Sequence, residues 1–178
     1  MQAKQMFLYD EGFAALSLYS GRTAPRLMVK QSDLGAVVGD GLFAAQPIAG
    51  PGVHLCDYSG TCYSTKDAMA KKDHSYLMRL GTRKYVDAFE HTNVLARFIN
   101  DCRNPALHNV KFVKLPELNK AMVVTLRPIL TGEELYVDYG KWYWAGFSGK
   151  PKKLSIKSTC ELLEKVEHLL KLRDQDSL

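Results

Sequence analysis

The sequence lacks the features that mark membrane-spanning, secreted and zinc-dependent proteins. No apolar run approaches the roughly 18 residues that a membrane span needs. Asp10 and Glu11 interrupt the apolar start that a secretory signal needs. The four cysteines show neither C-x-x-C spacing nor a nearby histidine pair, so we expect free thiols rather than a metal cluster. These absences predict an intracellular protein with no bound metal and no membrane partner.

An excess of positive charge is present instead. The chain has 178 residues, an apolar content of 46% and a formal net charge of +5, and its isoelectric point is about 9.0. The length fits one domain, and the charge fits an acidic partner such as nucleic acid or a nucleoprotein surface. Charge alone is a weak signal, because many ordinary enzymes are equally basic. Basic residues like these more often lie on a solvated face than bind a partner. The positions are Lys71, Lys72, Arg83, Lys84 and residues 150–157.

The body of the chain is rich in short β-like runs separated by turn residues. Only residues 64–72 look like a short helix in this part. No alternation of strands and helices is visible, which disfavours a parallel doubly wound sheet and favours several small sheets. The strands are predicted at residues 27–30, 53–56, 76–80, 85–87, 110–113, 122–126 and 134–137.

The end of the chain has a different pattern. Residues 146–157 are rich in Gly, Ser and Lys and predict a basic linker. Ser158 and Glu161 then have the spacing of a capping box, which predicts an amphipathic helix over residues 158–178. We expect this helix to pack on its own domain; the alternative is a dimer or partner helix. Its apolar series is Leu162, Leu163, Val166, Leu169 and Leu170.

Three segments carry most of the functional information. Gly39 and Gly41 open residues 39–44 (GDGLFA), where they let the backbone approach a ligand closely. Alone, such a pair is most often a turn, and no third glycine or helix follows to make a dinucleotide site. Residues 97–105 (RFINDCRNP) place many polar groups after two core residues. Residues 132–140 (GEELYVDYG) contain an Asp-Tyr-Gly sequence.

In this order, the three segments resemble the SET-domain protein lysine methyltransferases. That family carries G-x-G-L-F-A, R-F-[IF]-N-H-S-C-x-P-N and G-E-E-L-x-x-D-Y-G. Residues 57–60 also resemble its E-Y-x-G motif, residues 76–80 its Y-x-F-x-[LI] strand, and residues 88–100 its D-A-x-x-x-G-N-x-A-R-F-I-N segment, with Thr92 in place of the glycine. The resemblance covers residues 25–145 and leaves residues 1–24 as an N-terminal flank.

The resemblance implies a β-rich α+β fold: a SET fold of several small antiparallel sheets. In that family the C-terminal strand is threaded through a loop, a pseudoknot. It implies an S-adenosylmethionine-dependent protein lysine N-methyltransferase, with S-adenosylhomocysteine as product. The expected substrate is a histone tail, with a non-histone protein second, and the expected location is the nucleus. Contact with a nucleosome through the basic surface and a homodimer are further expectations. Two alternatives are a catalytically silent SET-like binding module and a basic nucleic-acid-binding domain.

The resemblance also assigns roles to individual residues. Tyr139 is the catalytic residue, and no residue is assigned to a metal. The substrate channel is lined by Tyr58, Met78, Asn109 and Val137. The cofactor is bound by Val38, Gly39, Asp40, Gly41, Leu42, Tyr76, Arg97, Phe98, Asn100, Asp101, Tyr139, Tyr143 and Trp144.

The chain departs from the family pattern at three places. Asp101 replaces the histidine and Ala106 replaces the last asparagine of N-H-S-C-x-P-N, so the hydrogen bonds of that segment must change. Residues 141–144 (KWYW) form either an aromatic core cluster or a cover over the adenine and the lysine channel. Val137 stands where the family often has Phe or Tyr, which predicts room for at least dimethylation, unless Asn109 restores the restriction.

Overall fold

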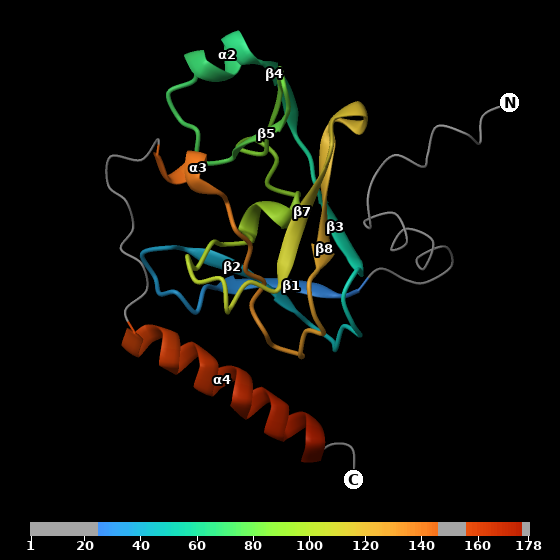
Figure 1. Cartoon of the computed structure of the whole chain (residues 1–178), viewed down its shortest axis with the longest axis vertical. Helices are drawn as coiled ribbons and strands as arrows, with labels where there is room; N and C mark the ends of the chain where they lie inside the picture. The colour runs from blue at the N-terminus through green and yellow to red at the C-terminus, as the bar shows by residue number, and fades with distance from the viewer. Residues whose placement is uncertain (1–24, 146–155, 176–178) are drawn as a thin grey trace, which may run out of the picture.

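The computed structural model describes residues 25–145 and 156–175, with the side chains of residues 160–172 in the last helix (Figure 1). The predicted flank at residues 1–24 and most of the predicted linker, residues 146–155, lie outside the described residues. Residues 156 and 157 of the predicted linker already belong to a helix.

The described part of the chain forms three small sheets in which every strand pair is antiparallel. This confirms the prediction of a β-rich fold with small sheets. A two-stranded sheet pairs β1 (Leu27–Gln31) with β2 (Asp40–Ala44). The central sheet has the order β3 (His54–Tyr58), β8 (Lys120–Thr125), β7 (Val110–Leu115). The outer sheet has the order β4 (Thr61–Ser64), β6 (Lys84–Asp87), β5 (Leu77–Gly81).

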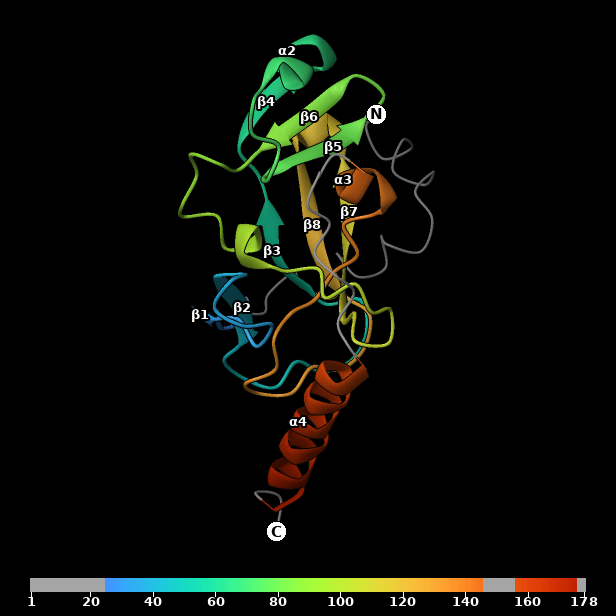
Figure 2. The same cartoon turned by 90° about the vertical axis from the view of Figure 1, so that its left-hand side faces the viewer.

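The sheets and helices are arranged in tiers along the long axis (Figures 1 and 2). The outer sheet and α2 (Thr65–Ala70) lie at one end, and α4 (Ile156–Gln175) lies at the other. The central sheet and the β1–β2 pair lie between them. The short 3-10 helix η1 (Leu95–Phe98) contacts both β2 and β3, and a second one, η2 (Pro116–Leu118), joins β7 to β8. The short helix α3 (Lys141–Ala145) follows the last motif.

The helix predicted at residues 64–72 is confirmed as α2. Ser64 caps it, because its hydroxyl accepts a hydrogen bond from the Asp67 N–H at 3.3 Å. The helix at the end of the chain begins at Ile156, two residues before Ser158. Ser158 therefore lies within α4, and the predicted capping box is wrong.

Two strands, β2 and β4, were not predicted from the sequence, and the strand predicted at residues 134–137 is absent from the structure. β2 contains three consecutive side chains with 0% exposure, Leu42, Phe43 and Ala44, so it lacks the alternation that marks a half-buried strand. β4 is short and mostly exposed. Residues 134–137 form no strand, because Glu134 bridges to Phe43 while Tyr136 bridges to Asn100. A segment that pairs with a different neighbour at each position cannot form a regular ladder.

That segment is the point where the conserved-looking motifs meet. The Val137 N–H donates to the Asn100 carbonyl at 3.0 Å, and the Leu135 N–H donates to the Leu42 carbonyl at 2.8 Å. On the other side, the Tyr136 carbonyl accepts from Asn109 N–H at 3.1 Å. The three motifs of the sequence analysis are thus hydrogen-bonded to one another at a single crossing.

Helix α4 contacts the body on the far side of this crossing. Leu162 is 9% exposed and packs in a small cluster with Cys102, Leu107 and Tyr136. Lys165 pairs with Asp33. Leu163, which belongs to the predicted apolar series, is instead 42% exposed. Within residues 25–145 and 156–175, no helix combines the length and the apolar character that crossing a membrane requires.

Candidate active site

An aromatic cluster surrounds the ring of Tyr139. Tyr143 meets this ring edge-on, with centroids 4.5 Å apart. The Trp144 ring lies nearly parallel to it at 5.9 Å. Both partners belong to α3, which therefore covers Tyr139, whereas Trp142 on the same helix is 80% exposed. This packing is an aromatic cluster around Tyr139, and the proposed cover over the adenine and the lysine channel stays a prediction.

The hydroxyl of Tyr139 is fixed by the second motif. It donates a hydrogen bond of 2.6 Å to the Ile99 carbonyl. Burial raises the pKa of Tyr139 well above its usual value, and the neighbouring Tyr143 and Tyr58 raise it further. The hydroxyl is therefore protonated at physiological pH and can donate but not act as a base.

Three of the four predicted channel residues lie in the same apolar cluster as Tyr139. Tyr58 and Val137 are buried in this cluster, and Met78 packs against it. The Tyr58 hydroxyl donates to the Tyr76 carbonyl at 2.5 Å, and its ring meets Phe112 edge-on at 5.6 Å. Burial raises the pKa of Tyr58 as well. Apolar walls with fixed hydroxyl groups suit an uncharged amine.

The structure does not bring Asn109 to this cluster. Its side chain is 0% exposed. Its amide donates to the Glu133 carboxylate at 3.0 Å and to the Glu134 carbonyl at 2.8 Å, and its oxygen accepts from Tyr136 N–H at 2.8 Å. All of these partners belong to the 132–140 motif, so Asn109 stabilises that segment. The role of Asn109 as a channel residue, and its restriction of methylation, stay predictions.

The two glycines of the first motif have different roles. Gly39 has a φ of 89°, which a residue with a side chain rarely adopts. A Cβ at Gly41 would overlap the Glu134 carboxylate. Val38 is 47% exposed, and Asp40 is exposed too, so the backbone before β2 is accessible to a ligand. Leu42, in contrast, is fully buried, so only its backbone could contact a cofactor.

Glu134 holds the loop that contains Gly39 and Gly41. This role of Glu134 was not predicted from the sequence. It is 2% exposed. Oε1 accepts from Ser32 Oγ at 2.7 Å and Asn100 Nδ2 at 3.2 Å. Oε2 accepts from Asp33 N–H at 2.7 Å and the Tyr136 hydroxyl at 2.8 Å. The signal in the sequence was a second glutamate in an otherwise apolar run, but its partners lie up to a hundred positions away.

Asn100 links the first two motifs through the same amide. Besides its bond to Glu134, Nδ2 donates to the Asp40 carbonyl at 3.1 Å. The predicted cofactor residue therefore also fixes the backbone of the glycine loop.

Arg97 carries a buried donor that no described residue satisfies. Its guanidinium lies over the rings of Tyr76 and Phe98, at 4.2 and 5.1 Å from their centroids. One terminal nitrogen donates to the Phe89 carbonyl at 3.3 Å. Nε is buried without a hydrogen-bond partner among the described residues, and buried donors normally have one. A ligand carboxylate fits this position, since arginine nitrogens match carboxylate oxygens.

Asp101, the departure from the family pattern, binds both Tyr139 and the cover. Oδ2 accepts from the Tyr139 N–H at 3.1 Å and from Trp144 Nε1 at 2.8 Å. Oδ1 accepts from the Arg103 N–H at 2.6 Å and lies 3.2 Å from His108 Nε2. The resemblance predicts only that Asp101 binds the cofactor and that the hydrogen bonds of its segment change; these side-chain partners were not predicted.

No cluster of metal-ligating side chains occurs in the described ranges. The cysteines there, Cys56, Cys62, Cys102 and Cys160, are free.

Comparisons with known proteins identify the family pattern independently. Residues 39–140 match the model of the SET domain. The "Histone-lysine N-methyltransferase, H3 lysine-4 specific" of Kluyveromyces lactis is 33% identical over 107 residues, which are 56% of this chain and 10% of that protein. The histone-lysine N-methyltransferase EHMT1 of Homo sapiens is 33% identical over 101 residues, which are 53% of this chain and 8% of that protein. The chain thus covers no more than a tenth of either relative.

Proposed function

The chain belongs to the SET-domain family, and from this membership we propose that it is an S-adenosylmethionine-dependent protein lysine N-methyltransferase. A protein lysine methyltransferase is the activity that its relatives support. The observation that carries the proposal is Tyr139, whose hydroxyl is fixed on the Ile99 carbonyl inside an aromatic enclosure. The proposed substrate is a histone tail, as the printed names of both relatives suggest; a non-histone protein is second. A histone substrate implies a nuclear location.

The proposed reaction is direct displacement in a tyrosine-lined channel. A free lysine with a pKa of about 10.4 is only about a thousandth neutral near physiological pH. The apolar cluster of Tyr58, Met78 and Val137 penalises the ammonium form, so it favours entry of the reactive neutral amine. The Tyr139 hydroxyl stays protonated, because its pKa is raised, and it orients the amine and polar C–H groups beside it. The chain needs no general base.

The residues of the cofactor side fit S-adenosylmethionine. When bound, the cofactor supplies a methyl group on a positively charged sulfonium. We assign its carboxylate to the unsatisfied Arg97 Nε and its amino-acid end to the exposed backbone at Val38 and Asp40. The rings of Tyr76 and Phe98 pack against the Arg97 guanidinium. Tyr143 and Trp144 on α3 are proposed to cover the adenine.

The crossing of the motifs is proposed to be a pseudoknot. Residues 135–137 are hydrogen-bonded to Leu42 and Asn100 on one side, and the Tyr136 carbonyl to residues 109 and 110 on the other. This arrangement supports threading of the C-terminal segment past the loop that follows Asn100. Contact with a nucleosome through the basic surface and a homodimer are further proposals.

A catalytically silent binding module is the second candidate. The observation that favours it is the tight cover: Tyr139, Tyr143 and Trp144 are mutually packed, with Tyr143 and Trp144 centroids 5.0 Å apart. Turnover requires this cover to admit both the cofactor and a lysine, which a binding module does not need.

Calorimetric titration with S-adenosylmethionine tests the proposal. We expect saturable binding by the wild-type protein. Asn100→Ala should weaken it by about 1–3 kcal/mol, because the substitution leaves buried polar partners unpaired. The matched control is Asn119→Ala in an exposed turn after η2, which should bind as the wild type does. An unchanged dissociation constant in Asn100→Ala would show that the pocket lies elsewhere, and no binding by the wild type would favour the silent module.

A further inference from the structure

The side chain of Asp101 is a buried carboxylate at the edge of the proposed active site. It is 2% exposed, and the paired side chain of His108 is 11% exposed. Its two oxygens face different groups: Oδ1 faces the Arg103 N–H and His108, whereas Oδ2 faces the Tyr139 N–H and the Trp144 indole. The four contacts place this one side chain between the turn after Asn100, the backbone of Tyr139 and the helix α3.

One oxygen of the Asp101 carboxylate, Oδ2, contacts both the predicted catalytic residue Tyr139 and Trp144 in the α3 cover. Tyr139 and Trp144 are separated in the chain by the Gly140 turn, whose φ is 82°, and by the first residues of α3. Oδ2 nevertheless accepts from both, at 3.1 and 2.8 Å. The indole is thus held twice, by stacking on the Tyr139 ring at 5.9 Å and by its hydrogen bond to Asp101. A shift of the cover must therefore strain or break the bond of Trp144 to the same carboxylate oxygen that accepts from the Tyr139 N–H.

The charge of Asp101 strengthens both bonds. Hydrogen bonds to an ionised acceptor are shorter and roughly twice as strong as neutral ones. The Arg103 guanidinium lies 4.9 Å from the centre of the Trp144 ring, so a cation also rests on the indole. The cover is consequently held by directional, charge-assisted contacts as well as by ring packing.

We propose that Asp101 is a positioning residue that couples closure of the α3 cover to the placement of the Tyr139 ring. The catalytic consequence rests on the proposed methyltransferase function, whereas the coupling itself does not. The competing explanation is that ring packing alone holds Trp144, and that Asp101 only satisfies buried donors.

Trp144 provides a direct reporter of this coupling. The chain has two tryptophans, so Trp142→Phe leaves Trp144 as the only one, and Trp142 is largely exposed. In this background, Asp101→Asn tests the carboxylate. The backbone N–H groups of Arg103 and Tyr139 and the indole N–H must all donate, and the carboxamide can present its oxygen to only one side. We expect a red-shifted emission and at least twofold stronger quenching by acrylamide.

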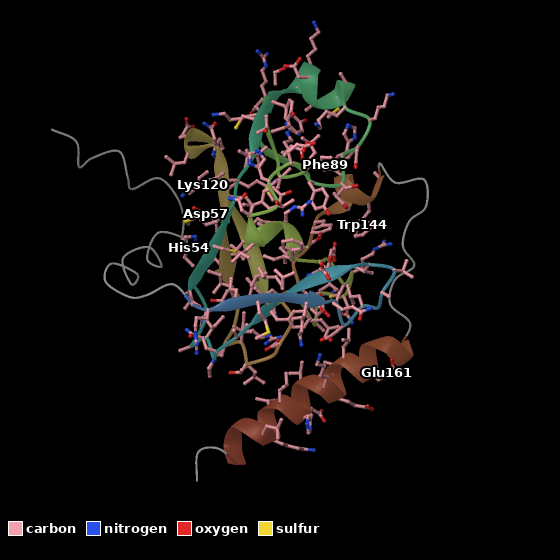
Figure 3. All side chains as sticks on the ribbon, turned by 180° about the vertical axis from the view of Figure 1, so that it is seen from behind. His54, Asp57, Phe89, Lys120, Trp144 and Glu161 are labelled. Carbon is pink, nitrogen blue, oxygen red and sulfur yellow. The ribbon has the colours of Figure 1, made fainter. Side chains whose placement is uncertain are left out.

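A matched control separates this effect from the general loss of a carboxylate. Asp57 is also a paired carboxylate, which contacts His54 and Lys120. Figure 3 shows this group on the opposite side of the view from Trp144. Asp57→Asn in the same background should leave the emission and quenching of Trp144 unchanged. Equal changes in both variants, or none in Asp101→Asn, would overturn the proposal.

A second measurement needs no buried substitution and so does not depend on the folding of Asp101→Asn. In Trp142→Phe protein, hydrogen exchange of the remaining indole N–H can be followed by NMR. We expect exchange at least tenfold slower than in the unfolded chain, because the indole donates to Asp101. Exchange at the unfolded rate would overturn the proposed bond.

Kinetics test the catalytic consequence. Trp144→Phe keeps an aromatic ring but removes the donor. If Asp101 acts through Trp144, then Asp101→Asn and Trp144→Phe should each lower kcat by about tenfold, with the peptide KM within about twofold. The double variant should lose little more than either single variant. Multiplying losses would refute the coupling, whereas an inactive wild type with the predicted Trp144 signals would refute the proposed function alone.

Discussion

Two buried carboxylates at the motif crossing, Glu134 and Asp101, bind different segments of the chain. Glu134 binds the loop before β2 through Ser32 and Asp33, together with Asn100. Asp101 binds the Tyr139 backbone and the α3 cover. Each accepts hydrogen bonds from several segments that are distant in sequence, yet Glu134 organises the proposed cofactor side and Asp101 the proposed catalytic side.

The difference shows how one crossing can serve two purposes. The donors around Glu134 are a hydroxyl of Ser32, a hydroxyl of Tyr136, an amide and a backbone N–H, all of them neutral. The group around Asp101 includes a histidine and an indole under a guanidinium. The first region is therefore a support held by neutral donors, and the second is a charged contact between Tyr139 and the α3 cover, which we propose must separate to admit substrate. The predictions below separate these regions.

The largest expected effect belongs to the catalytic side. Tyr139→Phe should lower the rate of methyl transfer by about 10²–10³-fold, since it removes the hydroxyl that the Ile99 carbonyl fixes at the proposed reacting centre. The ring remains, so the fold and most cofactor affinity should survive. Steady-state kinetics and calorimetry measure the two quantities. Tyr63→Phe on β4 is the matched control, and full activity in Tyr139→Phe would refute the catalytic assignment.

The next effect concerns the fixed support. Glu134→Gln leaves donors facing an amide nitrogen, and each unsatisfied buried donor costs about 1–3 kcal/mol. We expect a lower free energy of unfolding in denaturant titrations and weaker cofactor binding, because the glycine loop loses its anchor. The exposed Glu117→Gln on η2 serves as control. If Glu134→Gln instead loosened the indole of Trp144 and left cofactor binding intact, the two regions would have the same role.

Helix α4 packs against the motif crossing, and we expect substitutions in this helix to have a smaller effect on stability. Leu162→Ala should lower the free energy of unfolding by about 2 kcal/mol, since Leu162 is 9% exposed among Cys102, Leu107 and Tyr136. Leu163→Ala, at a position 42% exposed, should cost much less. Removal of residues 158–178 should likewise lower the melting temperature. A truncated chain that keeps its stability but changes from dimer to monomer would support the partner-helix alternative.

The smallest predicted effect changes the product rather than the rate. Val137 is buried two residues before Tyr139 and lacks the hydroxyl that could hold a blocking water. We expect at least dimethylation of a peptide under excess cofactor, and Val137→Tyr should shift the products toward the monomethyl form. Mass spectrometry of the peptide measures this distribution. A wild-type product that stops at one methyl would contradict the open-channel argument.

Much of the fold could be predicted from local patterns. Six of the seven predicted strands overlap a strand of the structure, for example residues 122–126 with β8, and α2 lies within the helix predicted at residues 64–72. β2 was missed because it is buried on both faces. Residues 134–137 were misassigned because apolar alternation does not reveal that each residue pairs with a different segment.

The sequence motifs predict which residues belong to the site, but not the hydrogen-bond partners of their side chains. Tyr58 and Val137 belong to the main buried core, against which Met78 and Tyr139 pack; their roles as channel residues stay predictions. The side-chain partners of Asp101 and Glu134 could not be predicted, because hydrogen bonds to residues dozens of positions away depend on the completed fold. The same holds for Asn109, whose amide bonds to the 132–140 segment could not be read from its position along the chain.

Methyl transfer from labelled S-adenosylmethionine to a panel of core histones tests the central claim most directly. The panel should be assayed in parallel with wild-type protein and Tyr139→Phe at equal concentration. We predict label on lysine in at least one histone with the wild type and almost none with Tyr139→Phe. Equal labelling by both proteins would contradict the assignment of Tyr139 as the catalytic residue. If a wild type that binds the cofactor labelled no histone, the proposed histone substrate would be contradicted.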